Sequence, residues 1–152
     1  MMASVLQNDG NVDVRGDALS ETVIGAAIDV HRALGPGLLE SAYGACLEYA
    51  LRVRRVSFER EAAVPIRYHE VQLDCGYRAD FLIERTLVVE IKAIKRLLPI
   101  HNAQVATYLK LLNADHGLLF NFNVQILRHG IRSITLASLP DLAGPPVLPS
   151  SC

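Results

Sequence analysis

The sequence predicts an α/β (α+β) fold in which helices flank a single sheet. Apolar residues recur at helical spacing over two early stretches, 20–34 and 38–54, before any strand pattern begins. Three runs with strand character follow between residues 56 and 93. A helix that begins at Pro99 separates them from a last strand region that begins at Gly117. The expected order is therefore helix, helix, three strands, helix, strand, strand.

The first helix has clear start and stop signals. Ser20 is the expected N-cap, and apolar residues from Val23 to Leu34 follow at helical spacing. Gly35 suits the left-handed position that ends a helix, and Pro36 cannot continue the turn. His31 lies on or beside the apolar stripe, where a packed or capping histidine is a simpler interpretation than a ligand.

The second helix, expected from Leu38 to Arg54, carries an acid in an unfavourable place. Glu40 falls on the same face as Tyr43 and Leu47, which is the face that should pack on the sheet. A carboxylate on that face is costly without a partner. Glu40 is therefore either a first-turn residue that the helix dipole stabilises or a functional acid.

The middle of the chain predicts strands joined by turns. His69-Glu70 and Glu84-Arg85-Thr86 are the turn signals. Pro65 indicates that the first strand lies at an edge or is irregular, because proline donates no ladder hydrogen bond. The expected strands are Val56–Tyr68, Val71–Ile83 and Leu87–Ala93.

Two acids and a lysine fall on the last two of these strands. If the strands pair as a hairpin, Asp80 near the start of one lies beside Glu90 near the end of the next, and Lys92 shares the face of Glu90. Two such carboxylates repel unless a cation joins them, and oxygen-only ligands suit Mg²⁺ or Mn²⁺. Lys92 can bind a phosphate or steady an activated water. Solvated charges at strand ends are the alternative interpretation, because this spacing also arises by chance.

The helix expected from Pro99 to Asn113 carries two further candidates. Gln104 and Tyr108 lie one turn apart on one side of it. A solvated glutamine and a core aromatic residue explain the pair equally well. The strand expected at 117–122 follows, and a strand or strand pair at 125–136, broken at His129-Gly130, ends the ordered part.

Charge gives no general attraction to nucleic acid, because the formal net charge is −1. Any binding of nucleic acid must come from a local basic patch. Candidates are the residues at the end of the second helix and around the third, namely Arg54, Arg55, Lys95, Arg96 and Lys110.

Length and composition bound the remaining possibilities. The 152 residues fit one domain, expected at 18–137, between a flexible tail at 1–17 and a proline-rich tail at 138–152. No apolar run reaches the roughly 18 residues that span a bilayer, and the N-terminus lacks the features of a signal peptide, so we expect a cytoplasmic protein. The three cysteines have no CxxC spacing, which predicts neither disulfides nor structural zinc.

Several ordered motifs together resemble the PD-(D/E)xK nuclease superfamily. The segment Gly37-Leu38-Leu39-Glu40-Ser41-Ala42-Tyr43, with the residues from Val30 that precede it, is more closely similar to the signature of the GxxExxY protein family within that superfamily. The resemblance covers about residues 20 to 135. Its other parts are Glu90-Ile91-Lys92-Ala93, Gln104-x₃-Tyr108-Leu109 and the run Gly117 to Phe122.

The resemblance implies a restriction-endonuclease-like core with a central mixed sheet flanked by helices. It also implies a metal site for Mg²⁺ or Mn²⁺ formed by Glu40, Asp80, Glu90 and the carbonyl of Ile91. Lys92 matches the motif lysine, and Gln104, with Tyr108, would position the water or the nucleic-acid backbone. Ala79 replaces the proline of the superfamily's name, which is structural rather than a ligand.

The function that follows is metal-dependent hydrolysis of DNA phosphodiester bonds. The alternative is a non-catalytic module of the same fold that binds nucleic acid or assembles into a homo-oligomer. An apolar excess, with 51% hydrophobic residues, favours some surface buried between subunits. An oligomer is compatible with both functions.

Overall fold

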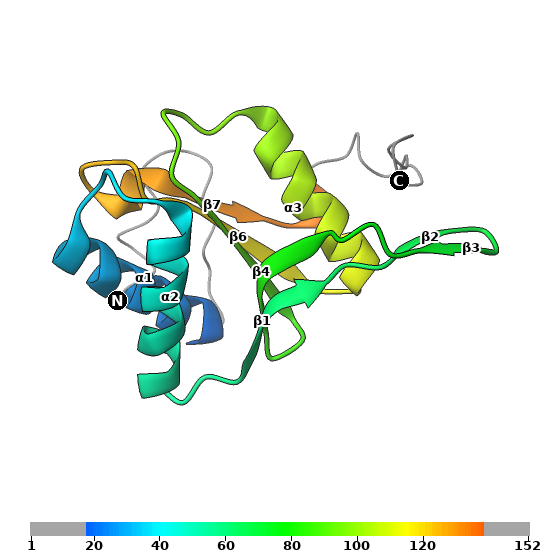
Figure 1. Cartoon of the computed structure of the whole chain (residues 1–152), viewed down its shortest axis with the longest axis horizontal. Helices are drawn as coiled ribbons and strands as arrows, with labels where there is room; N and C mark the ends of the chain where they lie inside the picture. Colours follow the sequence, from blue (N-terminus) through cyan, green and yellow to red (C-terminus); the bar gives the residue numbers. More distant parts are fainter. Residues whose placement is uncertain (1–17, 139–152) are drawn as a thin grey trace.

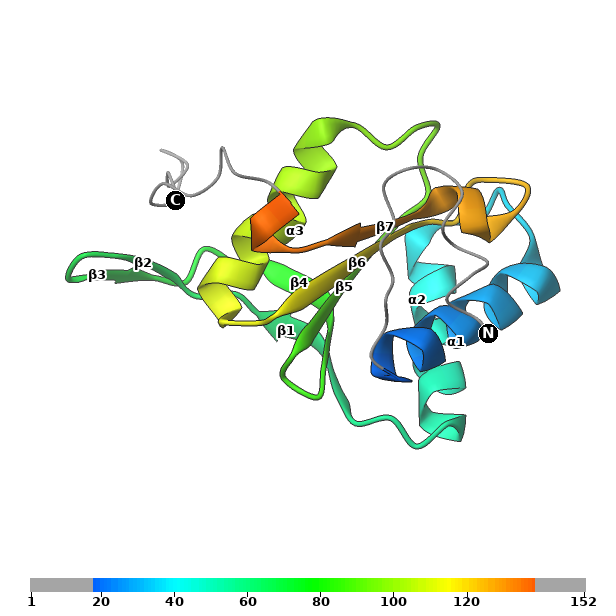
Figure 2. The same cartoon turned by 180° about the vertical axis from the view of Figure 1, so that it is seen from behind.

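A five-stranded sheet lies between two layers of helices in the computed structural model, which describes residues 18–138 (Figure 1). The elements are α1 (Ala18–Leu34), α2 (Glu40–Val53), α3 (Pro99–Leu112) and the sheet strands β1 (Phe58–Ala63), β4 (Arg78–Ile83), β5 (Leu87–Lys92), β6 (His116–Asn121) and β7 (Ile131–Ile134). Helices α1 and α2 cover one face and α3 covers the other, as the view from behind also shows (Figure 2). The predicted α/β (α+β) class, with a central mixed sheet flanked by helices, is confirmed. The predicted tails lie outside the described residues, apart from Ser138.

The sheet has the order β1-β4-β5-β6-β7. Strands β1, β4 and β5 form an antiparallel meander, β5 and β6 are parallel, and β7 is antiparallel to β6. Because parallel neighbours need a crossover, α3 connects β5 to β6 across one face. Strand β5 is therefore central, and it is buried from Leu87 to Ile91.

Successive side chains of the central strands alternate between the two helical layers. Phe81, Val89 and Ile91 pack into the core under α1 and α2. Leu82 and Val88 pack into the core under α3. The even-numbered positions of β4 and β5, which include the acids and the lysine, therefore face α3.

The meander contains an insertion that the sequence did not predict. The strand expected at 56–68 is divided into β1 and β2 (Ile66–Tyr68), and the one expected at 71–83 is divided into β3 (Val71–Leu73) and β4. Strands β2 and β3 pair only with each other, in a hairpin that extends away from the sheet (Figure 1). Pro65, between β1 and β2, lacks an N–H group and cannot donate a hydrogen bond to a neighbouring strand. After β3, the chain turns at Gly76, which has a φ of 78° and whose N–H donates to the Asp74 side chain.

Two other element boundaries differ from expectation. Ser20 is buried inside α1 rather than capping it, because Leu19 also packs against the core and the helix gains burial by extending to Ala18. The strand expected before Gly130 is wrong, since η3 (Leu127–Gly130) is a 3₁₀ turn and η4 (Leu136–Ser138) follows β7. The expected left-handed Gly35 is confirmed, with a φ of 72°.

Two findings concern the wider chemistry of the chain. No helix within residues 18–138 is both long and apolar enough to cross a membrane.

Cys46 is a free thiol, but Cys75 is disulfide-bonded, which corrects the prediction of no disulfides. A disulfide requires two Cα atoms within about 7 Å in space, and sequence spacing does not reveal such proximity.

Gly130 lets two segments cross at the end of β6. A Cβ atom at this position would lie 2.2 Å from the carbonyl oxygen of Asn121. The Asn121 side chain, in turn, accepts a hydrogen bond from the N–H of Ile94 (3.1 Å) and donates one to its carbonyl (3.0 Å). The close contact at Gly130 therefore supports the residue that holds the loop after β5.

We predict that Gly130→Ala destabilises the protein by about 1–3 kcal/mol, the usual cost of overpacking a core, because backbone and not a movable side chain meets the new methyl group. Urea unfolding monitored by circular dichroism measures this loss. His129→Ala is the matched control, since this neighbouring side chain is exposed, and it should stay within about 0.5 kcal/mol of the native protein. Equal midpoints for the native protein and Gly130→Ala would contradict the close crossing.

Candidate metal and catalytic site

Two carboxylates lie between β4 and β5 at the point where the strands separate. Regular pairing ends at Phe81 and Val89. Beyond it, the N–H of Asp80 donates to Oε1 of Glu90 (2.8 Å), and the N–H of Ile91 donates to Oδ2 of Asp80 (2.7 Å). Each side chain thus takes the place of a backbone acceptor on the opposite strand.

The turn between these strands sets the register that brings the acids together. Glu84 and Arg85 both have left-handed backbones, with φ values of 48° and 60°, and the N–H of Thr86 donates to the carbonyl of Ile83. Two left-handed residues match the right-handed twist of a hairpin. A shift of one residue would send Glu90 to the opposite face.

Burial makes this pair hold a proton more tightly than exposed carboxylates do. Glu90 is only 4% exposed, and its burial, followed by the charge of Asp80, raises its pKa to about 8. Burial also raises the pKa of Asp80, while the Ile91 N–H and the charge of Lys92 act in the opposite direction. The metal-free site therefore carries less negative charge at neutral pH than its two acids suggest.

Glu40 reaches the same end of β5 from the start of α2. Its Oε2 accepts a hydrogen bond from the N–H of Ala93 (3.3 Å), and its charge contributes to the raised pKa of Asp80. The expectation that Glu40 shares the buried stripe of the helix is wrong, because the side chain is exposed. As the first residue of α2, it extends past the helix end toward the strand.

Tyr43 holds the segment that leads into this helix. Its hydroxyl donates to the carbonyl of Gly35 (2.5 Å) and accepts from the N–H of Leu38 (3.2 Å). Its ring is fully buried and stacks on Phe122 at a centroid distance of 4.4 Å. Tyr43 thereby positions the turn before Glu40 relative to the end of β6.

Lys92 and the α3 residues lie on the other side of the acids. The charge of Lys92 lowers the pKa of both Asp80 and Glu90, which places the ammonium group near them. Burial, and then the charge of Glu90, raises the pKa of Tyr108, so this hydroxyl lies close to the site. Gln104 donates to Tyr108 Oη at 3.4 Å. The structure thus brings the predicted catalytic residues and acids to one place.

A cavity of about 290 Å³ opens beside the acids and contains two residues that the sequence did not suggest. It is lined by Glu40, Asp80 and Ile91 together with Arg60 and Glu61 of β1. Arg60 pairs with Glu48 at 2.8 Å and lies against Gly44, where a Cβ atom would be 2.7 Å from Nη2. The register of β1 on β4 brings Arg60 and Glu61 to the cavity, and no local sequence motif indicates this.

Glu61 has an unusual backbone for a strand residue. Its φ is 52°, and it lies opposite Asp80, where the pairing of β1 with β4 is interrupted between Arg60 and Ala62. A left-handed backbone at a residue other than glycine costs about 1–3 kcal/mol of folding free energy and is often found at functional sites. Glu61 is therefore a further acid at the rim of the cavity.

The predicted basic residues are divided among three places. Arg54 and Arg55 lie at the far end of α2, roughly 20 Å from Glu40 along 14 residues of helix, and Arg54 pairs with Asp29. Lys95 and Arg96 are exposed directly after β5. Lys110 lies in the last turn of α3, at the end that leads into β6. Of these, Lys95 and Arg96 are the nearest in the chain to Glu90 and Lys92.

The donor set fits a hard divalent cation. Among residues 18–138, no three His, Cys, Asp or Glu side chains already converge as a complete ligand cluster. Asp80 and Glu90 nevertheless supply adjacent oxygens, and burial, the largest cause, raises the pKa of both carboxyl groups. Glu40, which is exposed, already reaches the same end of β5 through its hydrogen bond with Ala93. Carboxylate oxygens without His or Cys partners suit Mg²⁺ or Mn²⁺ rather than zinc.

The family model of the PD-(D/E)XK nuclease superfamily matches residues 17–134. This range includes every residue of the carboxylate site described above. No curated protein and no solved structure matches the chain at a significant level.

We predict that the metal-free protein loses stability as the pH rises from 4.5 to about 8. In this window the folded state keeps a proton on Glu90 that the unfolded state, with the ordinary pKa of 4.5, has released, so the free energy of unfolding falls. Thermal unfolding in EDTA at several pH values measures the slope. Glu90→Gln cannot titrate and should flatten it.

Glu70→Gln, in the exposed turn of the β2–β3 hairpin, is the control and should keep the native slope. The same slope in the native protein and in Glu90→Gln would show that Glu90 is ionised in the metal-free protein.

Proposed function

The chain belongs to the PD-(D/E)XK nuclease superfamily, and we propose that it is a metal-dependent nuclease that hydrolyses DNA phosphodiester bonds. The observation that carries this proposal is the pair Asp80 and Glu90, held between separating strands with Lys92 beside them. Such buried acids cost stability and are expected where a cation binds.

We further propose membership of the GxxExxY family. Its signature tyrosine, Tyr43, binds both ends of the turn between Gly35 and Leu38, and its glutamate, Glu40, contacts the end of β5. The two named residues thus have connected roles, one in fixing the turn and the other in completing the acid site.

In the proposed mechanism, Asp80 and Glu90, with Glu40, would hold the Mg²⁺ or Mn²⁺ ion, and the carbonyl of Ile91 would be a further ligand. When bound, the ion would supply Lewis acidity toward the phosphodiester and lower the pKa of a water. Lys92 stabilises negative charge on the phosphate oxygens as the bond breaks. Gln104 and Tyr108, linked by their hydrogen bond, orient the attacking water or the strand.

DNA is the proposed substrate because two cationic side chains follow the strand that carries Glu90 and Lys92. Lys95 and Arg96 are exposed on the loop that follows Lys92. The Asn121 side chain binds both backbone groups of Ile94 and so holds the start of this loop. A held loop that presents two cations suits a phosphate backbone.

We predict Mg²⁺- or Mn²⁺-dependent cleavage of supercoiled plasmid or single-stranded DNA, abolished by EDTA. Asp80→Asn, Glu90→Gln and Lys92→Ala should each lower the rate by about 100-fold or more, because the first two weaken the proposed cation site and the third removes the charge beside the phosphate. Gel assays under single-turnover conditions measure the rates.

Glu70→Gln is the matched control and should cleave at the native rate, since its side chain is remote and exposed. A native rate in Asp80→Asn or Glu90→Gln would refute the assignment. No cleavage by folded native protein with either metal would favour a non-catalytic role.

One observation favours assembly as a second function. Tyr49 and Val53 are 71% and 61% exposed and lie one turn apart on the outer side of α2. Exposed aromatic and aliphatic neighbours are typical of protein interfaces. We propose that this part of α2 contacts a second copy of the chain in a homo-oligomer.

Light scattering coupled to gel filtration tests this assembly. The native protein should have the mass of an oligomer at micromolar concentration, and the double variant Tyr49→Ser, Val53→Ser should have that of a monomer, because the variant removes apolar contact area. A monomeric native protein, or an oligomeric double variant, would contradict the role of this surface.

A further inference from the structure

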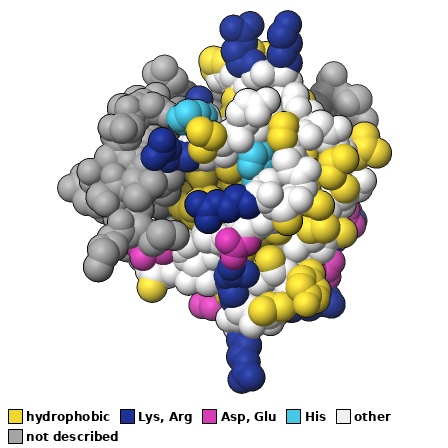
Figure 3. All heavy atoms as spheres, turned by 90° about the vertical axis from the view of Figure 1, so that its left-hand side faces the viewer, with side chains coloured by type: hydrophobic (Ala, Val, Ile, Leu, Met, Phe, Trp, Pro, Cys, Tyr) yellow, Lys and Arg dark blue, Asp and Glu magenta, His cyan; other side chains and the backbone are white. Residues whose placement is uncertain are grey.

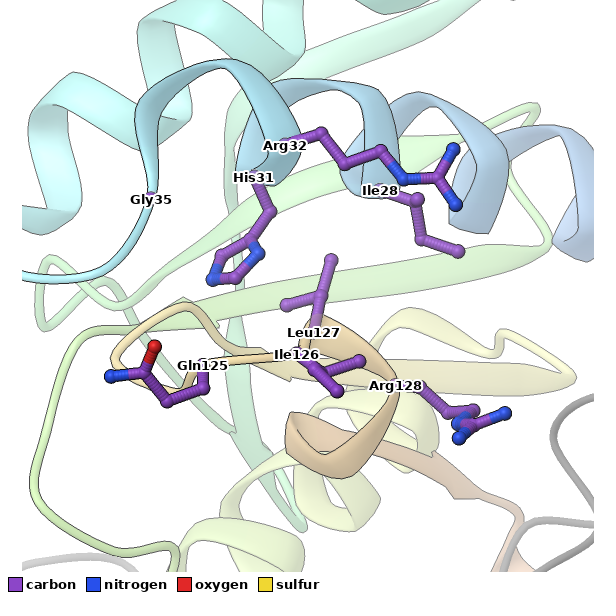
Figure 4. A pocket seen from close by; sticks show the side chains of 8 residues that line it. All are labelled: Ile28, His31, Arg32, Gly35, Gln125, Ile126, Leu127 and Arg128. Carbon is purple, nitrogen blue, oxygen red and sulfur yellow. The ribbon is translucent and has the colours of Figure 1, made fainter.

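A second pocket lies between α1 and η3, away from the carboxylates. It has a volume of about 470 Å³, within the range of small-ligand sites. Figure 4 shows Ile28, Ile126 and Leu127 along the pocket, with Arg32 of α1 and Arg128 of η3 extending to the same side. Among residues 18–138, no Asp or Glu lines it.

Both arginines are available for an anionic ligand. Neither Arg32 nor Arg128 has an ion pair or hydrogen bond to another residue in the described part of the chain. Five other arginines, at 52, 54, 60, 78 and 85, each pair with a carboxylate. On the side of the molecule where α1 and η3 lie, hydrophobic side chains are visible between Lys and Arg side chains (Figure 3).

The walls of the pocket are held in place, while its mouth carries exposed groups. The ring Nε2 of the buried His31 hydrogen-bonds the carbonyl of Val124 (2.8 Å), which ties the segment before η3 to α1. Ile126 is 52% exposed, although apolar, and the Gln125 amide is exposed beside it. A preformed wall with an apolar surface and a free amide suits the face and edge of a base.

The pocket is also connected to the acid site through one segment. Gly35 lines the pocket, and its carbonyl accepts the hydrogen bond from Tyr43 that fixes the turn before Glu40. Gly35 and Glu40 are five positions apart in the sequence, which is at most roughly 17 Å of extended chain. A strand a few nucleotides long can therefore reach from one site to the other.

We propose that this pocket binds one nucleotide of a single-stranded nucleic acid. The base contacts Ile126 and Leu127, Gln125 hydrogen-bonds its edge, and the phosphates on its two sides bind Arg32 and Arg128. Guanidinium groups are well suited to phosphate oxygens, and two flanking phosphates account for two arginines on either side of an apolar surface. This inference rests on the proposed function only in taking the ligand from a nucleic acid.

The test is calorimetric titration of the full chain with thymidine 3′,5′-bisphosphate in EDTA, where no metal is bound and no cleavage occurs. Native protein should bind it more tightly than it binds thymidine or inorganic phosphate. Arg32→Gln and Arg128→Gln should each weaken binding about tenfold, which is the effect of losing one charge-assisted hydrogen bond. Ile126→Ser should weaken binding of the bisphosphate but not of phosphate.

Two further variants separate this inference from the nuclease assignment. Arg67→Gln, on the exposed hairpin, controls for net charge and should bind as the native protein does. Asp80→Asn should also keep native affinity, because the acid site is not used. The proposal would be overturned, whatever the cleavage assay shows, by any of three results. These are no binding by the native protein, loss of binding in Asp80→Asn, or native affinity in both Arg32→Gln and Arg128→Gln.

Discussion

The exchange of hydrogen bonds between Asp80, Glu90 and the two strand backbones is the interaction on which the site depends. Where β4 and β5 separate, each carboxylate accepts an N–H group of the opposite strand, so the strands part without leaving buried donors unpaired. The same bonds fix the two acids side by side. Burial raises the pKa of Glu90 to about 8. The two carboxyl groups are therefore more stable with a proton or a cation between them than as two unneutralised charges.

The two helical layers complete this centre from opposite faces of the sheet. On one side, Tyr43 binds the turn before α2, and Glu40 then contacts the backbone at the end of β5. On the other side, α3 presents Tyr108 and Gln104. Both layers thus contribute side chains near the C-terminal end of β5, the central strand of the sheet. The candidate site residues therefore come from four elements.

The turn at Gly35 joins the acid site to the pocket between α1 and η3. His31 binds the segment before η3, while the next residue, Arg32, stays unpaired at the pocket. The end of α1 and the turn after it therefore contribute both to the packing of the helical layer and to the surface that the proposed nucleic-acid strand would cross. Arg128 lies across the same pocket, and neither of these two guanidinium groups has a carboxylate partner among the described residues.

Most helices and strands and the candidate acids could be predicted from the sequence, because periodicity, turn residues and the spacing of Asp80, Glu90 and Lys92 are local features. It did not determine where β1 ends, since Pro65 and Gly76 act by interrupting pairing with a distant strand. The three-dimensional arrangement was needed to show that Arg60 and Glu61 line the cavity, that Gly130 must lack a side chain, and that Arg32 and Arg128 share a pocket. These relations depend on register and on contacts between residues far apart in the chain, which no local pattern encodes.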